Sequence, residues 1–410
     1  MKEILLMKAY ERLLKYVVVP TPSNENSKTV PSSQCQFDLA HLLVAELKEL
    51  GVGDAYVDDR CYVYGHINAT PGLESKPRLG FIAHMDTVSD FTDHKTAPII
   101  TENYDGKDLP LGDSGRVLCT ENFKHLPSLK GRTLITTDGT TILGADNKAG
   151  IAEIMTMIER LITENIPHGP ICISFTPDEE IGTGPDHFNV EAFGADFAFT
   201  IDGGQEGEIQ YENFNACKAS FEIHGFNVHP GASKDTMINA SLVAMEINSM
   251  LPTCETPRGT EDYEGFYHLI SMSGEVAFAK LNYAVRDHRQ GCFDAKKHTL
   301  RLIEKTINEK WGLNTTKLTI TDQYKNMEEV ITGCMHLIEN AEKACQAVGL
   351  TPLIIPIRGG TDGSQISFKG IPCPNLGTGG YAAHGPYEHI TAEGMDLVVD
   401  MVLELIKLYA

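Results

Sequence analysis

Three apolar segments of this sequence end in side chains that can bind a metal ion. Each segment has the length and composition of a buried strand. The side chains are His84 and Asp86 after residues 80–83, Glu179 and Glu180 after residues 171–176, and Asp202 after residues 197–201. Imidazole and carboxylate groups are ligands of zinc, and a carboxylate beside a metal-bound histidine can orient its ring. The chemistry that these residues indicate is therefore that of a bound metal ion.

Two further candidates lie outside these strand ends. Asp146 precedes a run of apolar residues at helical spacing, so it is either the N-cap of a helix or a carboxylate that bridges metal ions. The local sequence favours neither interpretation. His384 lies in a glycine-rich segment and, taken alone, is more simply a loop histidine, just as His84 and Asp86 alone are more simply a strand end with a capping aspartate. The recurrence of such residues along the chain is what favours a common site.

The number of candidate ligands bears on the kind of centre. A catalytic zinc ion has three protein ligands and an open position. Even if only five of the seven candidates are ligands, they are too many for one such ion. They fit two ions about 4 Å apart that share one carboxylate. The sequence contains neither the His-Glu-x-x-His motif of single-zinc proteases nor a Gly-x-Ser-x-Gly nucleophile motif.

An α/β sheet would bring these side chains together, because ligands of open α/β sheets bind beyond the carboxyl ends of the strands. The 410 residues exceed the size of one ordinary core, so we expect two domains. We predict a catalytic domain formed by residues 1–212 and 324–410, with a mixed, mostly parallel sheet flanked by helices. The polar, turn-rich residues 90–137 form a loop or small hairpin excursion from it.

Residues 213–323 are inserted into this catalytic domain. Their pattern of strand, helix, strand, strand, helix and strand predicts a ferredoxin-like α+β domain, with a four-stranded sheet backed by two helices. We expect it to act as a lid, or to form the interface of a homodimer by pairing its edge strands with those of a second chain.

Composition limits the partners and the compartment. The formal net charge of −22 disfavours nucleic acid, because phosphate binding needs Lys and Arg. The ten cysteines include no Cys-x-x-Cys pair, so we expect reduced thiols in a cytoplasmic protein. The segment from Leu5 to Val18 mixes apolar and charged residues and predicts an amphipathic helix, not a signal peptide or a membrane span.

Several motifs together resemble the M20 family of dinuclear zinc peptidases. The motifs shared with the whole family are residues 83–87, 143–150, 178–182 and 383–385. Those similar to its tripeptide-aminopeptidase branch are residues 228–231, 265–269, 356–363 and 372–376. The resemblance implies that the chain hydrolyses the N-terminal peptide bond of tripeptides, with a water that bridges two zinc ions per chain.

The resemblance also implies a role for each candidate at the centre. His84 and Asp202 would hold one zinc ion, Glu180 and His384 the other, and Asp146 would bridge both. Asp86 would orient His84, and Glu179 would be the general base that takes a proton from the attacking water and returns it to the leaving amine.

Four further residues resemble family positions that contact the substrate. They are His229, Asn239, Arg286 and Arg358. His229 would donate a hydrogen bond to the developing oxyanion, which requires the two domains to close over the peptide. Arg286 has a simpler alternative, which is an ion pair with Asp287.

The sequence departs from the family pattern at two places. Asn147 stands where a second aspartate usually follows the bridging one, but that residue is not a ligand, so the metal site should survive. Ala382 and Ala383 leave more space than the bulkier side chains common in the tripeptide-aminopeptidase branch, so we expect an altered substrate preference.

Two alternative functions share these ligands. One is another activity of the same family, as a dipeptidase, carboxypeptidase or deacylase. The other is a non-catalytic metal-binding protein on the same fold. Glu179 argues against the second alternative, because a scaffold needs no general base.

Overall fold

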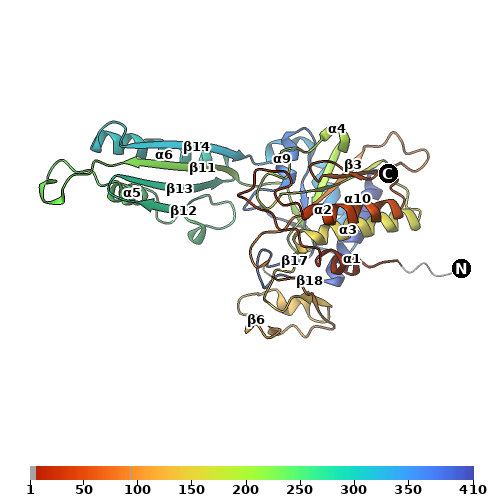
Figure 1. The fold of residues 1–410 in the computed structure, drawn as a ribbon. Coiled ribbons are helices and arrows are strands. Elements are labelled where there is room, and N and C mark those ends of the chain that lie inside the picture. The colour runs from red at the N-terminus through yellow and green to blue at the C-terminus, as the bar shows by residue number, and fades with distance from the viewer. Residues whose placement is uncertain (1–5, 93) are drawn as a thin grey trace. The chain divides into compact units, whose positions relative to one another are not determined.

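The computed structural model describes residues 6–92 and 94–410. The chain divides into two compact units, and Figure 1 labels many of their elements. The first unit comprises Met1–Tyr211, Glu329–Ile355 and Thr361–Ala410, and the second comprises Glu212–Glu328 and Pro356–Gly360. This division differs from the predicted one mainly in two short segments, residues 324–328 and 356–360, which belong to the second unit.

Polar contacts between distant segments explain this difference. The backbone N–H of Asn326 donates to the side chain of Asn215 over 3.0 Å. The guanidinium group of Arg358 donates to the backbone oxygens of Asp262 and Glu264 over 2.6 and 3.0 Å. Such contacts join residues about 100 positions apart, and no local sequence pattern reveals them.

An eight-stranded mixed sheet forms the centre of the first unit. Its order is β1 (Tyr56–Val57), β2 (Val63–Ile67), β8 (Ile171–Thr176), β3 (Leu79–His84), β9 (Phe197–Ile201), β16 (Asn375–Leu376), β10 (Glu208–Gln210) and β15 (Leu353–Ile354). The β8–β3, β3–β9, β9–β16 and β10–β15 pairs are parallel, and the other pairs are antiparallel. Every residue of β3 and β8 is buried, as expected of parallel strands covered on both faces. The predicted mixed, mostly parallel sheet is confirmed.

Helices cover both faces of this sheet. On one face, α3 (Ala145–Thr163) packs against β3 and against α1 (Ala9–Tyr16) and α10 (Ala392–Tyr409), and α10 packs against α8 (His336–Ala347). The remaining helices of the unit are α2 (Gln36–Glu49), which contacts β1 and β2, and α4 (Val190–Phe193) and α9 (Asp362–Phe368), which contact β8 and β9. Short helical turns are α7 (Glu328–Ile331) and the 3-10 segments Leu126–Leu129, Pro230–Ala232, Pro257–Gly259 and Thr332–Cys334.

The first helix is shorter than the sequence predicts. It spans Ala9–Tyr16, and the carboxylate of Glu11 accepts a hydrogen bond from the backbone N–H of Lys8 at its start. Leu5, where we expected the helix to begin, lies outside the described residues. Among residues 6–92 and 94–410, no helix is long and apolar enough to cross a lipid bilayer. All ten cysteines are free thiols.

The predicted excursion has structure of its own. It contains β4 (Ile99–Thr101), the β5–β6 hairpin (Leu109–Leu111 and Arg116–Leu118) and β7 (Leu134–Thr136). β7 pairs with β4 and with β18 (His389–Thr391), and β18 pairs with β17 (Gly380–Tyr381). The excursion therefore anchors the C-terminal segment that carries His384.

The second unit has the predicted ferredoxin-like fold. Its elements are β11 (Asn215–His224), α5 (Ala240–Ser249), β12 (Phe266–Gly274), β13 (Phe278–Asp287), α6 (Gln290–Trp311) and β14 (Thr316–Tyr324). The antiparallel sheet has the order β12-β13-β11-β14. Alternate residues of these strands, such as Phe221 and Leu281, form a core with Val243 of α5 and Leu300 of α6.

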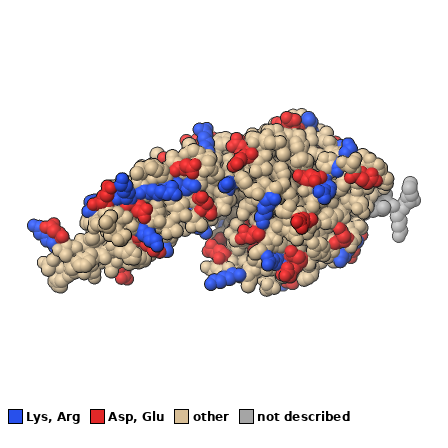
Figure 2. Space-filling view, turned by 90° about the horizontal axis from the view of Figure 1, so that it is seen from above, with Lys and Arg blue, Asp and Glu red and all other residues tan. Residues whose placement is uncertain are grey.

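Charged side chains of both signs lie on the surface of the protein. On the face shown in Figure 2, Lys and Arg side chains are dispersed among Asp and Glu side chains and form no continuous basic surface. The absence of a nucleic-acid partner stays a prediction from the net charge of −22.

Gly150 sets the distance between α3 and the end of β9. A Cβ atom on Gly150 would lie 2.0 Å from the backbone oxygen of Ile201 and 2.6 Å from Oδ1 of Asn147. We expect Gly150→Ala to lower the free energy of unfolding by about 1–3 kcal/mol or more, because the backbone must move. Thermal unfolding checks this, with Gly291→Ala as control, since a Cβ atom at Gly291 meets no atom within 4 Å. Equal Tm values for the two variants would contradict the prediction.

Glu153 makes stability depend on pH. Its side chain lies in α3, is 1% exposed, and neither carboxyl oxygen has a hydrogen-bond partner among the described residues. Burial raises the pKa of Glu153 well above its usual value, and the nearby Glu206 raises it further. The folded state therefore holds a proton that the unfolded state releases above its lower pKa, so stability falls as pH rises between the two values.

We expect Glu153→Gln to remove this pH dependence, because the amide cannot ionise. Wild type should lose up to about 1.4 kcal/mol of stability per pH unit between the two pKa values, and the variant should become the more stable protein as pH rises. Unfolding of both proteins between pH 5 and 8, at equal metal content, measures this. A constant difference across that range would contradict the prediction.

Candidate metal centre

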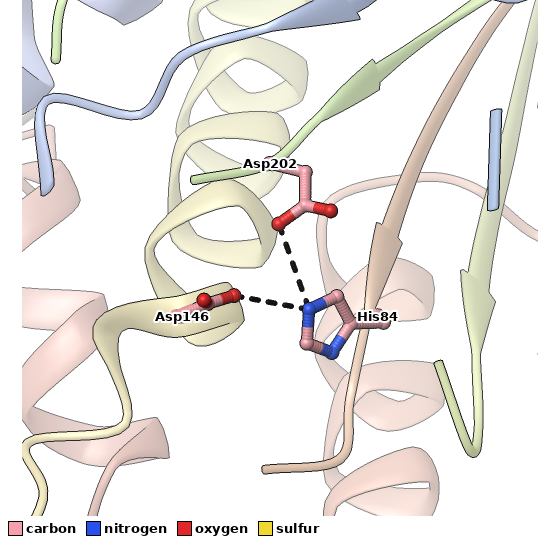
Figure 3. A group of neighbouring side chains, drawn as sticks. All are labelled: His84, Asp146 and Asp202. Atoms are coloured by element: carbon pink, nitrogen blue, oxygen red, sulfur yellow. Dashed lines mark hydrogen bonds and ion pairs between the residues drawn. The ribbon is translucent and has the colours of Figure 1, made fainter. Parts of the chain in front are cut away.

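His84 is the last residue of β3, and two carboxylates surround its ring. Its Nε2 atom lies 3.1 Å from Oδ1 of Asp146 and 3.5 Å from Oδ1 of Asp202 (Figure 3). Asp202 directly follows β9, the parallel neighbour of β3, so the sheet itself brings these side chains together. The Nδ1 atom of His84 lies 3.0 Å from the backbone oxygen of Asp86 and 3.3 Å from its Oδ1 atom. The ring is thus held by Asp86 with Nε2 toward the other two carboxylates.

Asp146 lies in the first turn of α3 but does not cap the helix. Gly144 occupies the N-cap position with a left-handed backbone, and no side chain caps the helix. Asp146 and Asn147 have non-helical backbone angles and are joined by a cis peptide bond. The carboxylate of Asp146 places Oδ1 and Oδ2 each 3.1 Å from the Nε2 atom of a histidine, His84 and His384 respectively. The N-cap interpretation is therefore wrong, and the geometry is that of a carboxylate shared by two sites.

Asn147 joins two of the ligand-bearing segments. Its side-chain Nδ2 donates to the backbone oxygen of Ile201 over 2.9 Å, and Ile201 directly precedes Asp202. The departure from the family pattern at this position leaves both Asp146 and Asp202 in place beside His84.

Glu388 fixes the start of α3, and the sequence did not point to it. Its Oε2 and Oε1 atoms accept hydrogen bonds from the backbone N–H groups of Gly144 and Asp146, over 2.7 and 2.9 Å. Burial raises the pKa of Glu388 to about 7. Glu388 and His384 belong to the same short segment, so that segment supplies one candidate ligand and anchors the backbone of another. A carboxylate that binds backbone N–H groups distant in sequence carries no local signal.

The two glutamates reach one site because the chain turns sharply after β8. Asp178 has a φ of +59°, and its buried carboxylate is held by hydrogen bonds from Ser32 and Gln36. The Asp86 carboxylate accepts hydrogen bonds from the backbone N–H groups of Glu179 and Glu180, over 2.9 and 3.2 Å. Asp86 therefore holds this turn as well as His84.

The glycines of this turn have different roles. Gly182 has a φ of +75°, the left-handed conformation that favours glycine. Gly184 does not have a positive φ. A Cβ atom there would lie 2.4 Å from Oδ1 of Asp362, so this glycine permits a close approach of that buried side chain.

Glu180 and His384 form a second group with Asp146. The Oε2 atom of Glu180 lies 3.1 Å from Nε2 of His384. The Oε1 atom of Glu180 is buried and has no hydrogen-bond partner among the described residues. The ligand atoms of His84, Asp146 and Asp202 lie within 4.8 Å of one another, and so do those of Asp146, Glu180 and His384. This arrangement matches two metal ions that share one carboxylate.

The electrostatics of the centre fit bound cations. Burial raises the pKa of Glu179 well above its usual value, and Asp202, Asp362 and Glu180 raise it further. Hydrogen bonds to Asp146 and Glu180 raise the pKa of His384 to about 11. Buried carboxylates at this density need compensating positive charge, which protons on the histidines supply here and divalent cations can supply in their place. The donor set of imidazoles and carboxylates suits zinc and related ions.

Comparison with known proteins gives the family of this chain. The model of "Peptidase family M20/M25/M40" matches residues 138–408. The chain belongs to this peptidase family. A relative from Clostridium perfringens called Peptidase T is 50% identical over 406 residues, which cover 99% of this chain and 100% of that protein. The M20 fold, the hydrolase class and a metal-binding centre follow from this membership.

Solved structures support the same fold. A tripeptidase from Staphylococcus aureus has a TM-score of 0.77 with 23% identity, and covers 98% of both chains. An aminopeptidase from Bacillus cereus has a TM-score of 0.77 with 22% identity, and covers 98% of this chain and 97% of its own.

The substrate-binding candidates of this M20 chain belong to the second unit. His229 is exposed, and Asn239 caps α5 by accepting hydrogen bonds from the backbone N–H groups of Ser241 and Leu242. Arg358 binds the backbone oxygens of residues 260–264, so part of its hydrogen-bonding capacity positions that loop. Their assignment to substrate binding stays a prediction.

The contacts of Arg286 differ from the ion pair with Asp287 that the simpler alternative predicted. Its Nη1 atom donates to the backbone oxygens of Cys217 and Val285, over 3.2 and 3.0 Å, and its guanidinium group lies over the ring of Tyr324. Asp287 instead lies 3.7 Å from Nζ of Lys296. The structure therefore places the partner of Asp287 on α6.

Proposed function

We propose that this protein is an aminopeptidase that releases the N-terminal residue of tripeptides and uses two zinc ions. The observation that carries the proposal is the pair of ligand groups that share Asp146, with Glu179 at the same turn as the ligand Glu180. The names of the relatives, Peptidase T and tripeptidase, support the substrate class.

Each residue of the centre has a chemical role in this proposal. His84 and Asp202 hold one zinc ion, Glu180 and His384 hold the other, and Asp146 serves both. When bound, the ions supply Lewis acidity toward water and the scissile carbonyl. Glu179 accepts the proton of the attacking water and later donates it to the leaving amine. Its pKa, raised by burial, suits a group that must both take up and return a proton near neutral pH.

Asp86 acts by positioning. It holds the ring of His84 from one side and the backbone of Glu179 and Glu180 from the other. A single buried carboxylate thus sets the distance between one metal ligand and the general base. The ten free thiols support a reducing compartment, and we assign the protein to the cytoplasm.

Three substrates test the proposal. We expect chelator-sensitive release of the N-terminal residue from a free tripeptide, and no cleavage of its N-acetylated form or of the matching dipeptide. Cleavage of the blocked peptide or the dipeptide instead would move the protein to another activity of the M20 family. No cleavage of any substrate, with two metal ions bound, would support a non-catalytic metal-binding protein. The metal content of the purified protein tests zinc against cobalt and manganese.

We also propose that the second unit forms a homodimer through β12 and α5. β12 is an edge strand, so one side of it is unpaired in the sheet. It exposes Ile270 and Met272, and α5, which packs against β12, exposes Leu242 and Met245. An unpaired strand edge beside exposed apolar side chains suits a self-complementary interface.

Light scattering during size-exclusion chromatography tests this interface. We expect a dimer for wild type and a monomer for a variant with Leu242→Glu and Met245→Glu. The control is Leu302→Glu on α6, which alters another exposed leucine. A monomeric wild type at micromolar concentration, or a dimer that survives both α5 substitutions, would overturn the proposal.

A further inference from the structure

A cavity of about 360 Å³ in the first unit borders the metal centre. The carboxylate residue Asp146 forms part of its wall. So do Gly203, which follows Asp202, and Ala383, which precedes His384. The cavity thus adjoins three of the five candidate ligands and has the volume of a small-molecule binding site, which is typically about 300–1,000 Å³.

The walls of this cavity combine small residues, one aromatic face and three carboxylate residues, which are Asp146, Glu208 and Glu388. Gly204, Gly380 and Ala382 add no bulk, and the space that they leave can hold a substrate group. Glu208, on β10, is half-buried and is held by a hydrogen bond of 3.1 Å from the amide of Gln210. A group bound here would meet negative charge from Asp146 and Glu208.

The aromatic face of the cavity adds no positive charge. The rings of His125 and Tyr381 stack with their centroids 4.1 Å apart and their planes 10° apart. Burial lowers the pKa of His125, so its ring is neutral at neutral pH. The cavity therefore favours a cationic group with an adjoining side chain that can lie against aromatic rings.

Three other cavities of the described residues do not offer this combination. One of about 590 Å³ lies in the second unit and contains none of the five candidate ligands. One of about 190 Å³ is lined by Lys95 and Lys148, which repel a cation. One of about 450 Å³ is lined by Arg12 and Lys15 and contains no candidate ligand.

We infer that the 360 Å³ cavity binds the N-terminal residue of the tripeptide and that Glu208 holds its α-ammonium group. The inference rests on the proposed function, because an aminopeptidase keeps the ammonium group and the scissile carbonyl within one residue of each other. With the carbonyl at the metal ions, the ammonium group must bind directly beside the ligands. A carboxylate forms strong, charge-assisted hydrogen bonds with an ammonium group. A carboxylate that holds the ammonium group beside the ligands leaves one residue before the scissile bond, which accounts for cleavage after the first residue only.

The test compares a free tripeptide with its des-amino analogue, in which hydrogen replaces the α-amino group. We expect wild type to prefer the free tripeptide by about 10- to 100-fold in kcat/KM, and Glu208→Gln to lose most of this preference through a higher KM. The ratio of kcat/KM for the two substrates isolates the ammonium contact, because a merely structural change would lower kcat/KM for both substrates together. Metal content and Tm show whether the variant is folded. Glu121→Gln, at an exposed carboxylate of the same unit, is the matched control.

The outcomes separate this inference from the proposed function. A Glu208→Gln enzyme that keeps the wild-type preference would overturn the role of Glu208 and leave the tripeptide aminopeptidase standing. A wild type that cleaves no free tripeptide would overturn the proposed function itself. If Glu208→Gln does not fold, Glu208→Asp decides, since it keeps the charge on a shorter side chain and should retain only part of the preference.

Discussion

Replacing Glu179 with alanine lowers kcat for tripeptide hydrolysis by about 100- to 10,000-fold, the usual contribution of a positioned general base. Metal content and Tm stay near those of wild type, because the Glu179 side chain belongs to neither ligand group and its backbone N–H still binds Asp86. Steady-state kinetics with a free tripeptide and metal analysis of the same sample measure both expectations.

The control for this experiment is Glu191→Ala, which removes an exposed carboxylate from α4, the helix that follows the same turn. It should leave kcat unchanged. Turnover retained by Glu179→Ala at full metal content would remove the proposed mechanism. Loss of metal together with turnover would show instead that Glu179 is a ligand.

Replacing Asp146 with alanine removes both metal ions and lowers activity by about 1,000-fold or more. Asp146 is the residue common to the two ligand groups, with one oxygen toward each histidine. Bound metal ions supply several kcal/mol of transition-state stabilisation in such hydrolases, and each 1.36 kcal/mol corresponds to a tenfold change in rate. Metal content after dialysis at a fixed free zinc concentration measures the effect.

Asp202→Ala is the matched comparison, because Asp202 belongs to one ligand group only. Asp202→Ala should lower the metal content by one ion per chain and leave the group of Glu180 and His384 occupied. If Asp146→Ala also lost a single ion, the carboxylate would not be shared, and the centre would consist of two independent sites.

The sequence revealed the strands of the first unit because burial leaves a direct mark on composition. β3 and β8 are buried on both faces and are almost purely apolar, so the polar residues at their ends stand out. The contrast between apolar strands and the polar residues at their ends led to the ligand candidates. The polar, turn-rich composition of residues 90–137 led to the excursion. The inserted unit was recognised from the order of its predicted strands and helices, which can be read from the sequence without knowledge of the tertiary contacts.

Long-range polar contacts left no such mark. Glu388, Asn147 and Asp178 act through hydrogen bonds to segments 54 to 244 residues away, and nothing near them in the sequence distinguishes them from ordinary polar residues. Arg358 forms such long-range hydrogen bonds with Asp262 and Glu264, so residues 356–360 belong to the second unit and not to the predicted catalytic domain. Asp146 was ambiguous because a helix start and a metal ligand call for the same side chain, and only the backbone angles decided between them.

The contact between Glu388 and the start of α3 has a consequence for the order in which a nascent chain acquires activity. The strand that carries His84 and the helix that carries Asp146 are synthesised before Glu388 and His384, which lie 244 and 238 residues after their partners Gly144 and Asp146. Until then the centre lacks one histidine and the backbone anchor of its shared carboxylate. We therefore expect a chain that has not yet reached this segment to have an incomplete metal centre and to be inactive toward peptides in its surroundings.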